Sequence, residues 1–343
     1  MGTGIFRPAA AVSGLLLLLG TALGAMPPLA GDAAALARLA QAEALHGKSS
    51  PELLPIIGEL AASQMQSGAL AKAAHLRRRA LDIVVAAYGS GSIRAAAAMA
   101  AIARIDLARQ HYLDAEPLLI IAERTLSAAK HPDRSALAAV EAGLSRVALA
   151  RGDTNAAADW ARRAMERDAT GSTAPERALG AVLARQGKFA EGARILRRAL
   201  ARDRRIHGND STETARSLSQ LGNLYLRQKR AKAALPFLEE AAAIDRDRLG
   251  PDHPFIADDL HDVGIACEAL QRDNLARLLL RQALAILQRG AGRATPRAAY
   301  VELELRRVYE RAGEHAAAQA AFKAARHILD KTDAERRRRE RKA

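Results

Sequence analysis

A small residue returns at a fixed interval along most of this 343-residue chain. It stands at Ala80, Ala122, Ala164, Ala199, Ala241, Ala283 and Ala325, in steps of 42 residues apart from one step of 35. A second small residue precedes each of these by seven positions, and a mostly bulky residue lies between the two. Because a fixed period of this length indicates stacked copies of one supersecondary unit, it constrains the fold more than any single motif does.

Within each period the apolar spacing is that of a pair of helices. Residues 218–244 read "LSQLGNLYLRQKRAKAALPFLEEAAAI", in which two helical patterns flank a short polar turn at 228–232. One such hairpin cannot bury its own apolar stripe, but a stack of hairpins buries a continuous core. Ala, Leu and Arg, all good helix formers, are abundant, and aromatic residues make up 3% of the chain. The sequence therefore predicts an all-α solenoid.

The units resemble tetratricopeptide repeats, whose pattern places Leu-Gly and Tyr on the first helix and small and bulky residues on the second. The matching residues are Leu221-Gly222, Tyr225, Ala234, Leu238 and Ala241 in one unit, and Leu179-Gly180, Gly187, Phe189, Leu196 and Ala199 in another. The 42-residue step and linkers such as "LGPDHP" look like the long variant found in kinesin light chains. The resemblance covers residues 33–327 and implies a right-handed α-solenoid of about seven units.

The pattern also predicts the segments of the chain. These are a signal peptide or uncleaved anchor at 1–25, a capping helix at 32–46, three units at 51–167, four units at 172–329 and a basic tail at 330–343.

The N-terminal segment has the layout of a secretory signal peptide. Arg7 precedes an apolar run centred on Leu15–Leu19, and small residues follow at Ala22, Gly24 and Ala25. We therefore expect an exported protein, periplasmic or secreted. An uncleaved anchor is the alternative, because residues 9–26 are long enough to span a bilayer.

Charge and cysteine content narrow the classes of partner and chemistry. The formal net charge of +14 favours anionic partners, and the single cysteine, Cys267, excludes an intrachain disulfide. Cys267 occupies the repeat position of Tyr225 and Tyr309, which indicates a packed, inert thiol. Phosphate-loop, dinucleotide and nucleophile-elbow motifs do not occur in the sequence, so we expect no cofactor and no catalysis.

One segment has the residue types of a metal site. Residues 250–264, "GPDHPFIADDLHDVG", bring His253, Asp258, His261 and Asp262 close together in sequence. The unit 42 residues earlier shares the apolar, small and turn-forming positions but not these polar ones. We therefore interpret "GPDHP" as a linker and "FIADDLHD" as the polar face of a helix, and we expect no metal.

In the family that these units resemble, the first helices line a concave face that holds a peptide. Carried over unit by unit, this face consists of Arg104, Arg146, Arg177, Arg185, Asn223, Arg227, His261, Arg307 and Arg311. The acids expected near it are Glu268 and Glu310. Arginines in this number imply an acidic protein segment or a C-terminal carboxylate, bound by forked hydrogen bonds. Asn223 matches the clamp asparagine of chaperone-binding members, but Ser219 stands where those members have a lysine.

The expected function is that of an exported, non-catalytic scaffold that binds a protein partner in this groove. The alternative is a peripheral envelope protein attached to anionic lipid or polysaccharide, because the tail "KTDAERRRRERKA" is strongly basic. That tail could also be a solvated continuation of the last helix. Nucleic acid suits the charge, but predicted export and the scarcity of aromatic residues for base stacking argue against it.

Overall fold

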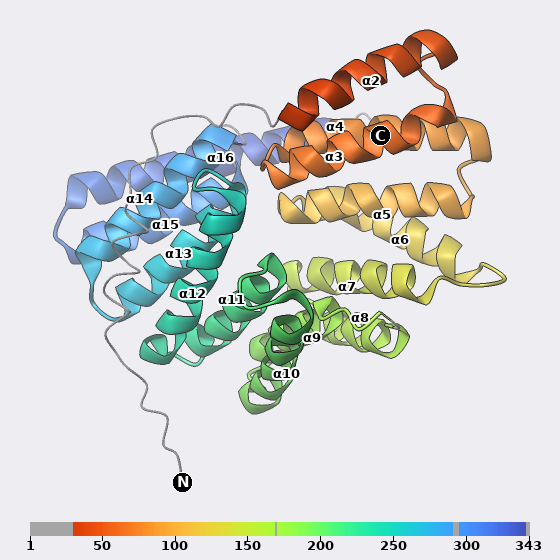
Figure 1. The fold of residues 1–343 in the computed structure, drawn as a ribbon. Helices are drawn as coiled ribbons and strands as arrows, with labels where there is room; N and C mark the ends of the chain where they lie inside the picture. Colours follow the sequence, from red (N-terminus) through yellow and green to blue (C-terminus); the bar gives the residue numbers. More distant parts are fainter. Residues whose placement is uncertain (1–29, 169, 291–294, 341–343) are drawn as a thin grey trace. The chain divides into compact units, whose positions relative to one another are not determined.

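The computed structural model describes residues 30–168, 170–290 and 295–340, and every regular element in this part of the chain is a helix (Figure 1). The predicted all-α class and the pairing of consecutive helices are confirmed. The predicted signal peptide or anchor lies outside the described residues. Within those residues, no helix combines the length and the apolar character that a membrane crossing requires.

The chain divides into two compact units, the first ending at Arg202 and the second beginning at Asp203. The division falls inside one helix, whereas the sequence indicates a boundary at the short step near residue 170. The first unit holds α2 (Ala30–His46), the short 3-10 helix η1 (Pro51–Leu53), α3 (Leu54–Gln66), α4 (Leu70–Tyr88), α5 (Ile93–Ala108), α6 (Tyr112–Ser127), α7 (Arg134–Ala150), α8 (Thr154–Arg167), α9 (Ala174–Arg185) and most of α10 (Phe189–His207).

The second unit holds the end of α10, then α11 (Thr212–Arg227), α12 (Ala231–Leu249), α13 (Pro254–Ala269), α14 (Asp273–Gly290), α15 (Pro296–Arg311) and α16 (His315–Glu340). The helix α2 packs on α3 and η1, at the place where the sequence predicts a capping helix. At the other end, α16 continues past residue 330, so the basic segment 331–340 is part of the last helix.

Local sequence accounts for where the helices begin and turn. Ser211, His253 and Thr295 lie 42 residues apart, and the side chain of each accepts a hydrogen bond from a backbone N–H in the first turn of the following helix. The turn within a helix pair needs one residue with positive φ. Gly152 supplies it in one pair with φ of 85°, and Lys229 supplies it in another with φ of 57°.

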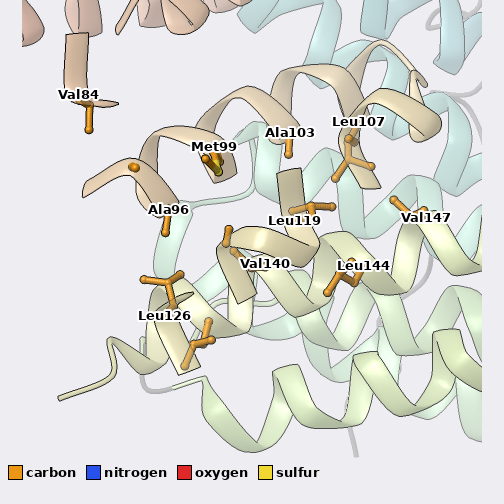
Figure 2. Close-up of a cluster of buried hydrophobic side chains, with 14 residues drawn as sticks. Val84, Ala96, Met99, Ala103, Leu107, Leu119, Leu126, Val140, Leu144 and Val147 are labelled. Carbon is orange, nitrogen blue, oxygen red and sulfur yellow. The ribbon is translucent and has the colours of Figure 1, made fainter. Parts of the chain in front are cut away.

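The small repeated residues lie where helices cross. Ala115, Ala157 and Ala241 are fully buried. At Gly222 an added Cβ would stand 2.5 Å from the Leu238 side chain on the next helix, so the two helices approach closely there. Figure 2 shows the apolar cluster that results in the first unit, to which α5 contributes Met99 and α7 contributes Leu144.

An aspartate recurs at the junction between repeats in the second unit. The hydroxyl of Ser217 donates to the buried Asp203 carboxylate at 2.5 Å. One repeat later the same two positions hold Asp245 and Asp259, so two carboxyl groups face each other. Burial raises the pKa of Asp245 to about 6. Burial and the charges of Asp245 and Asp262 raise the pKa of Asp259 well above its usual range.

Ala241→Leu should destabilise the second unit, because a larger side chain would overpack a crossing in which Ala241 is fully buried. We expect a loss of about 1–3 kcal/mol in the free energy of unfolding, measured by thermal melting. Ala243→Leu, at an exposed position of the same helix, is the matched control. Equal melting temperatures for the two variants would contradict this placement of the helix.

Replacing Asp259 with serine should restore the aspartate–serine pair seen at Asp203 and Ser217. Because the folded-state pKa values of Asp245 and Asp259 are raised, the folded chain holds protons that the unfolded chain has released. Stability is therefore lost as the pH rises through about 6 and above. We expect Asp259→Ser to gain on the order of 1–3 kcal/mol at pH ~8 and little at pH ~4.

Melting curves recorded across this pH range measure the difference between parent and variant. The exposed Asp247 on α12, changed to serine, controls for the loss of one acid. Parallel pH profiles for the parent and Asp259→Ser would show that the two carboxyl groups do not share a proton.

Candidate functional site

The first helices of neighbouring repeats form a layer of their own. α7 contacts both α5 and α9 in the first unit, and α13 contacts both α11 and α15 in the second. We use "inner surface" for the accessible side chains of the first helices, α3, α5, α7 and α9 in one unit and α11, α13 and α15 in the other. All nine predicted groove residues lie on these helices, four in the first unit and five in the second.

In the second unit, polar residues of the inner surface join one repeat to the next. The Asn223 side chain donates to the Asp262 carboxylate at 2.6 Å. The Arg307 guanidinium donates to both carboxylate oxygens of Glu268, each at 2.8 Å. In both cases the two partners are 39 residues apart, which is one repeat less about one helical turn. A search for polar pairs at this separation would have found them in the sequence.

These contacts neutralise the arginines at the end of the array. Arg307 also forms an ion pair with Glu304 at 2.9 Å, and Arg311 donates to Asp273 at 2.7 Å. Burial by itself would lower the pKa of Arg307, but the hydrogen bonds to Glu268 and the negative charges of Glu304 and Glu268 raise it. Glu310 pairs with the neighbouring Arg306 instead. On this part of the inner surface, the protein's own carboxylates therefore neutralise the arginines.

His261 lies within this acidic network. Its Nδ1 is 3.2 Å from an Asp262 oxygen. Burial would lower its pKa, but the hydrogen bond with Asp262 and the charges of Asp262, Glu304 and Glu268 raise it. The imidazole therefore takes up a proton more readily than a free histidine.

The inner surface of the first unit differs, because two of its arginines have no carboxylate partner among the described residues. Arg104 and Arg185 are exposed, and neither forms an ion pair among the described residues. Arg146 donates to the backbone carbonyl of Leu107 at 3.3 Å, and Arg177 donates to the Thr173 hydroxyl. The residues between these cations are small. They include Ala97, Ala100 and Ala139.

The segment with the residue types of a metal site has other contacts. The His253 ring accepts a hydrogen bond from the Phe255 N–H at 3.1 Å and so caps α13. Asp258 pairs with Arg297, and Asp262 accepts from Asn223. Within the described residues, no group of three or more His, Cys, Asp or Glu side chains is arranged to hold a metal ion.

Cys267 packs as the sequence indicates, and Trp160 also packs against apolar side chains. The Cys267 thiol is fully buried, and burial raises its pKa to about 11, which keeps it protonated and unreactive at neutral pH. The Trp160 ring packs against the apolar cluster of Figure 2, with the Arg163 guanidinium 5.0 Å from its centroid.

Comparisons with known proteins agree with this geometry. The family model for the tetratricopeptide repeat matches residues 173–247 and 234–289. None of the curated proteins matches the sequence. Among solved structures, a chain of the APC/C hetero-tetramer Cut9–Hcn1 is 16% identical with a TM-score of 0.57. That match covers 84% of this chain and 52% of the other, so this chain spans about half the length of that neighbour.

Two further structures share the repeat architecture at lower similarity. The repeats of a putative kinesin light chain from Podosopora anserina are 21% identical with a TM-score of 0.46, and the match covers 60% of this chain and 99% of that one. BtubC from P. vanneervenii is 15% identical with a TM-score of 0.38, covering 79% and 92%. From the family match, residues 173–289 consist of tetratricopeptide repeats, and the helix pairs before and after them repeat the same arrangement.

Proposed function

We propose that this chain is an exported, non-catalytic scaffold that binds an acidic segment of a protein partner on its inner surface. The observation that carries the proposal is the contrast between the two units. Acids of neighbouring repeats neutralise Arg307 and Arg311 in the second unit. Arg104 and Arg185 in the first unit have no such partner among the described residues.

Position and surroundings fit a bound polypeptide. Arg104 and Arg146 occupy the same position in consecutive repeats, so they are displayed from neighbouring first helices. The small side chains of Ala97, Ala100 and Ala139 leave room for a main chain to lie close to the helices. Guanidinium groups on such a surface bind carboxylates through charge-assisted, forked hydrogen bonds.

This proposal divides the nine predicted groove residues by role. The arginines of the first unit, Arg104, Arg146, Arg177 and Arg185, bind the partner. Asn223, Arg307 and Arg311 connect neighbouring repeats through Asp262, Glu268 and Asp273. Arg227 and His261 also belong to the second unit, where His261 lies against Asp262. A preformed surface of this kind binds with little rearrangement.

Export and the absence of catalysis are part of the proposal. The N-terminal sequence has the layout of a secretory signal, which supports export to the periplasm or beyond. The buried Cys267 thiol is unreactive, and the side chains of His253 and Asp258 are engaged in structural contacts, so none of the three supports catalysis. The Cut9–Hcn1 neighbour, a hetero-tetramer by its description, places a similar fold in a protein assembly.

Attachment to anionic lipid is the second candidate, and the last helix favours it. α16 continues to Glu340 and includes the basic segment, with Lys331 and Arg337 exposed. Each basic residue held near an anionic bilayer contributes about 1 kcal/mol to binding.

An affinity purification with chemical crosslinking, from the cells that make the protein, tests the scaffold role. Arg104→Glu combined with Arg185→Glu should lose the partner that the parent retains, because both changes place acids opposite an acidic segment. Arg124→Glu with Arg194→Glu makes the same change in net charge on second helices of the same unit, and should retain the partner. Circular dichroism must first show equal helix content in all three proteins.

Retention of the partner by the inner-surface variant would contradict the proposal and move the interface to the second helices. Loss from both variants would indicate attraction by charge alone.

Truncation of the chain after Asp330 tests attachment to lipid. If α16 binds anionic membranes, co-sedimentation with vesicles containing phosphatidylserine should fall by about tenfold or more in the truncated chain, and vesicles of phosphatidylcholine should bind neither form. Equal sedimentation of the full and truncated chains would remove the lipid role from this helix.

A further inference from the structure

An arginine occupies an apolar position of the first repeat. Arg77 stands where other repeats have Leu119, Leu196, Leu238, Leu280 and Phe322, the bulky residue that packs between the two helices of a pair. Leu119, Leu196 and Leu238 are buried almost completely. Arg77 belongs to the second helix α4, which packs against both α3 and α5. Its side chain therefore extends from the second-helix layer toward the first-helix layer.

The guanidinium of Arg77 reaches α3 next to a glycine. Its Nη2 is 3.5 Å from the Gly58 carbonyl oxygen, the outer limit of a hydrogen bond. A Cβ added at Gly58 would lie 3.8 Å from the Arg77 Nη1, so the missing side chain keeps this approach open. The Arg77 Nε is buried and has no hydrogen-bond partner among the described residues. A buried donor without an acceptor is unfavourable, so this arginine costs stability at a position where other repeats have leucine.

A second cation, Arg104 on α5, acts electrostatically on Arg77. Burial lowers the pKa of Arg77, and the positive charge of Arg104 lowers it further, so the two guanidinium groups interact repulsively. Neither arginine forms an ion pair among the described residues. The nearby acid of α5, Asp106, is fully buried and pairs with Arg78 and Arg109 instead. Folding thus leaves two interacting cations that no acid among the described residues pairs with.

We propose that Arg77 and Arg104 form the carboxylate-binding site that anchors the acidic segment of the partner, through the side chain of one of its aspartate or glutamate residues. A carboxylate that both guanidinium groups bind through their Nη atoms offsets the repulsion between them and forms charge-assisted hydrogen bonds. This inference rests on the proposed function. It places the anchoring point of the acidic segment in the first two repeats. Arg146, one repeat after Arg104, extends the row of cations along which the segment continues.

Fluorescence anisotropy with a labelled peptide tests the site directly. The probe is a short peptide of alternating glutamate and alanine with an amidated C-terminus, and its comparison is the same peptide with glutamine in place of glutamate. The parent chain should bind the first peptide and not the second. Arg77→Leu and Arg104→Ala should each weaken binding by about tenfold, the loss expected for one charge-assisted hydrogen-bonding group.

Two controls separate the site from general attraction and from misfolding. Arg124→Ala removes one exposed cation from a second helix of the same unit, and should bind within about twofold of the parent. Arg77→Leu installs the residue type that other repeats carry, so it should melt at a higher temperature than the parent. The glutamate peptide should raise the melting temperature of the parent and leave that of Arg77→Leu unchanged.

Binding of the peptide by Arg77→Leu at the affinity of the parent would overturn the proposal, as would an equal loss in Arg124→Ala or no binding by the parent. Two further outcomes would contradict recognition of a glutamate side chain. One is a requirement for a free C-terminal carboxylate, and the other is displacement by inorganic phosphate together with equal binding of the glutamine peptide. Crosslinking of the cellular partner separates the two proposals. If Arg77→Leu retains a partner that Arg104→Glu with Arg185→Glu loses, the scaffold role stands and this anchoring site does not.

Discussion

Each helix pair of this protein depends on a close helix crossing, which small residues make possible. At Gly222 there is no room for a Cβ against Leu238, and Gly180 meets Leu196 at the same distance in another repeat. The bulky residue of one helix fills the space that the glycine leaves on the other. Because each pair still exposes an apolar stripe, the next pair must cover it, and the fold grows by repetition. The rows of first-helix side chains follow from this packing.

Charge is distributed over these rows in two ways. In the second unit, Glu268 of one repeat receives Arg307 of the next, and Asn223 is joined to Asp262 in the same manner. Such contacts stabilise one repeat against its neighbour and leave little net charge. In the first unit, Arg104 and Arg185 have no carboxylate partner in the part of the chain that the structure describes. The positive charge of the chain is thus accessible on one part of the inner surface and already neutralised on another.

The carboxyl pair of Asp245 and Asp259 and the arginine Arg77 are departures from the repeat of different kinds. At Asp259 a serine of the preceding repeat is replaced by a second acid, and the raised pKa values of Asp245 and Asp259 favour protonation of the pair. At Arg77 a leucine position holds a cation, and within the described residues nothing of opposite charge offsets it. The change at Asp259 is offset within the chain, so it affects stability. The charge of Arg77 is not offset within the described residues, which supports the proposal that a ligand binds there.

The sequence by itself determined the helix pairs, because the spacing of Ala241, Leu238 and Ala234 repeats so regularly that local propensity and period agree. It also determined that the nine groove residues share the first helices. Only the tertiary structure decided which of them are accessible, because the acids that hold Arg307 and Arg311 come from a neighbouring repeat and not from nearby positions on the same helix. The approach of Arg77 to Gly58, and the effect of the Arg104 charge on it, were likewise decided by the packing of three helices. A side chain's partners across a helix junction depend on register and distance, which a one-dimensional pattern does not contain.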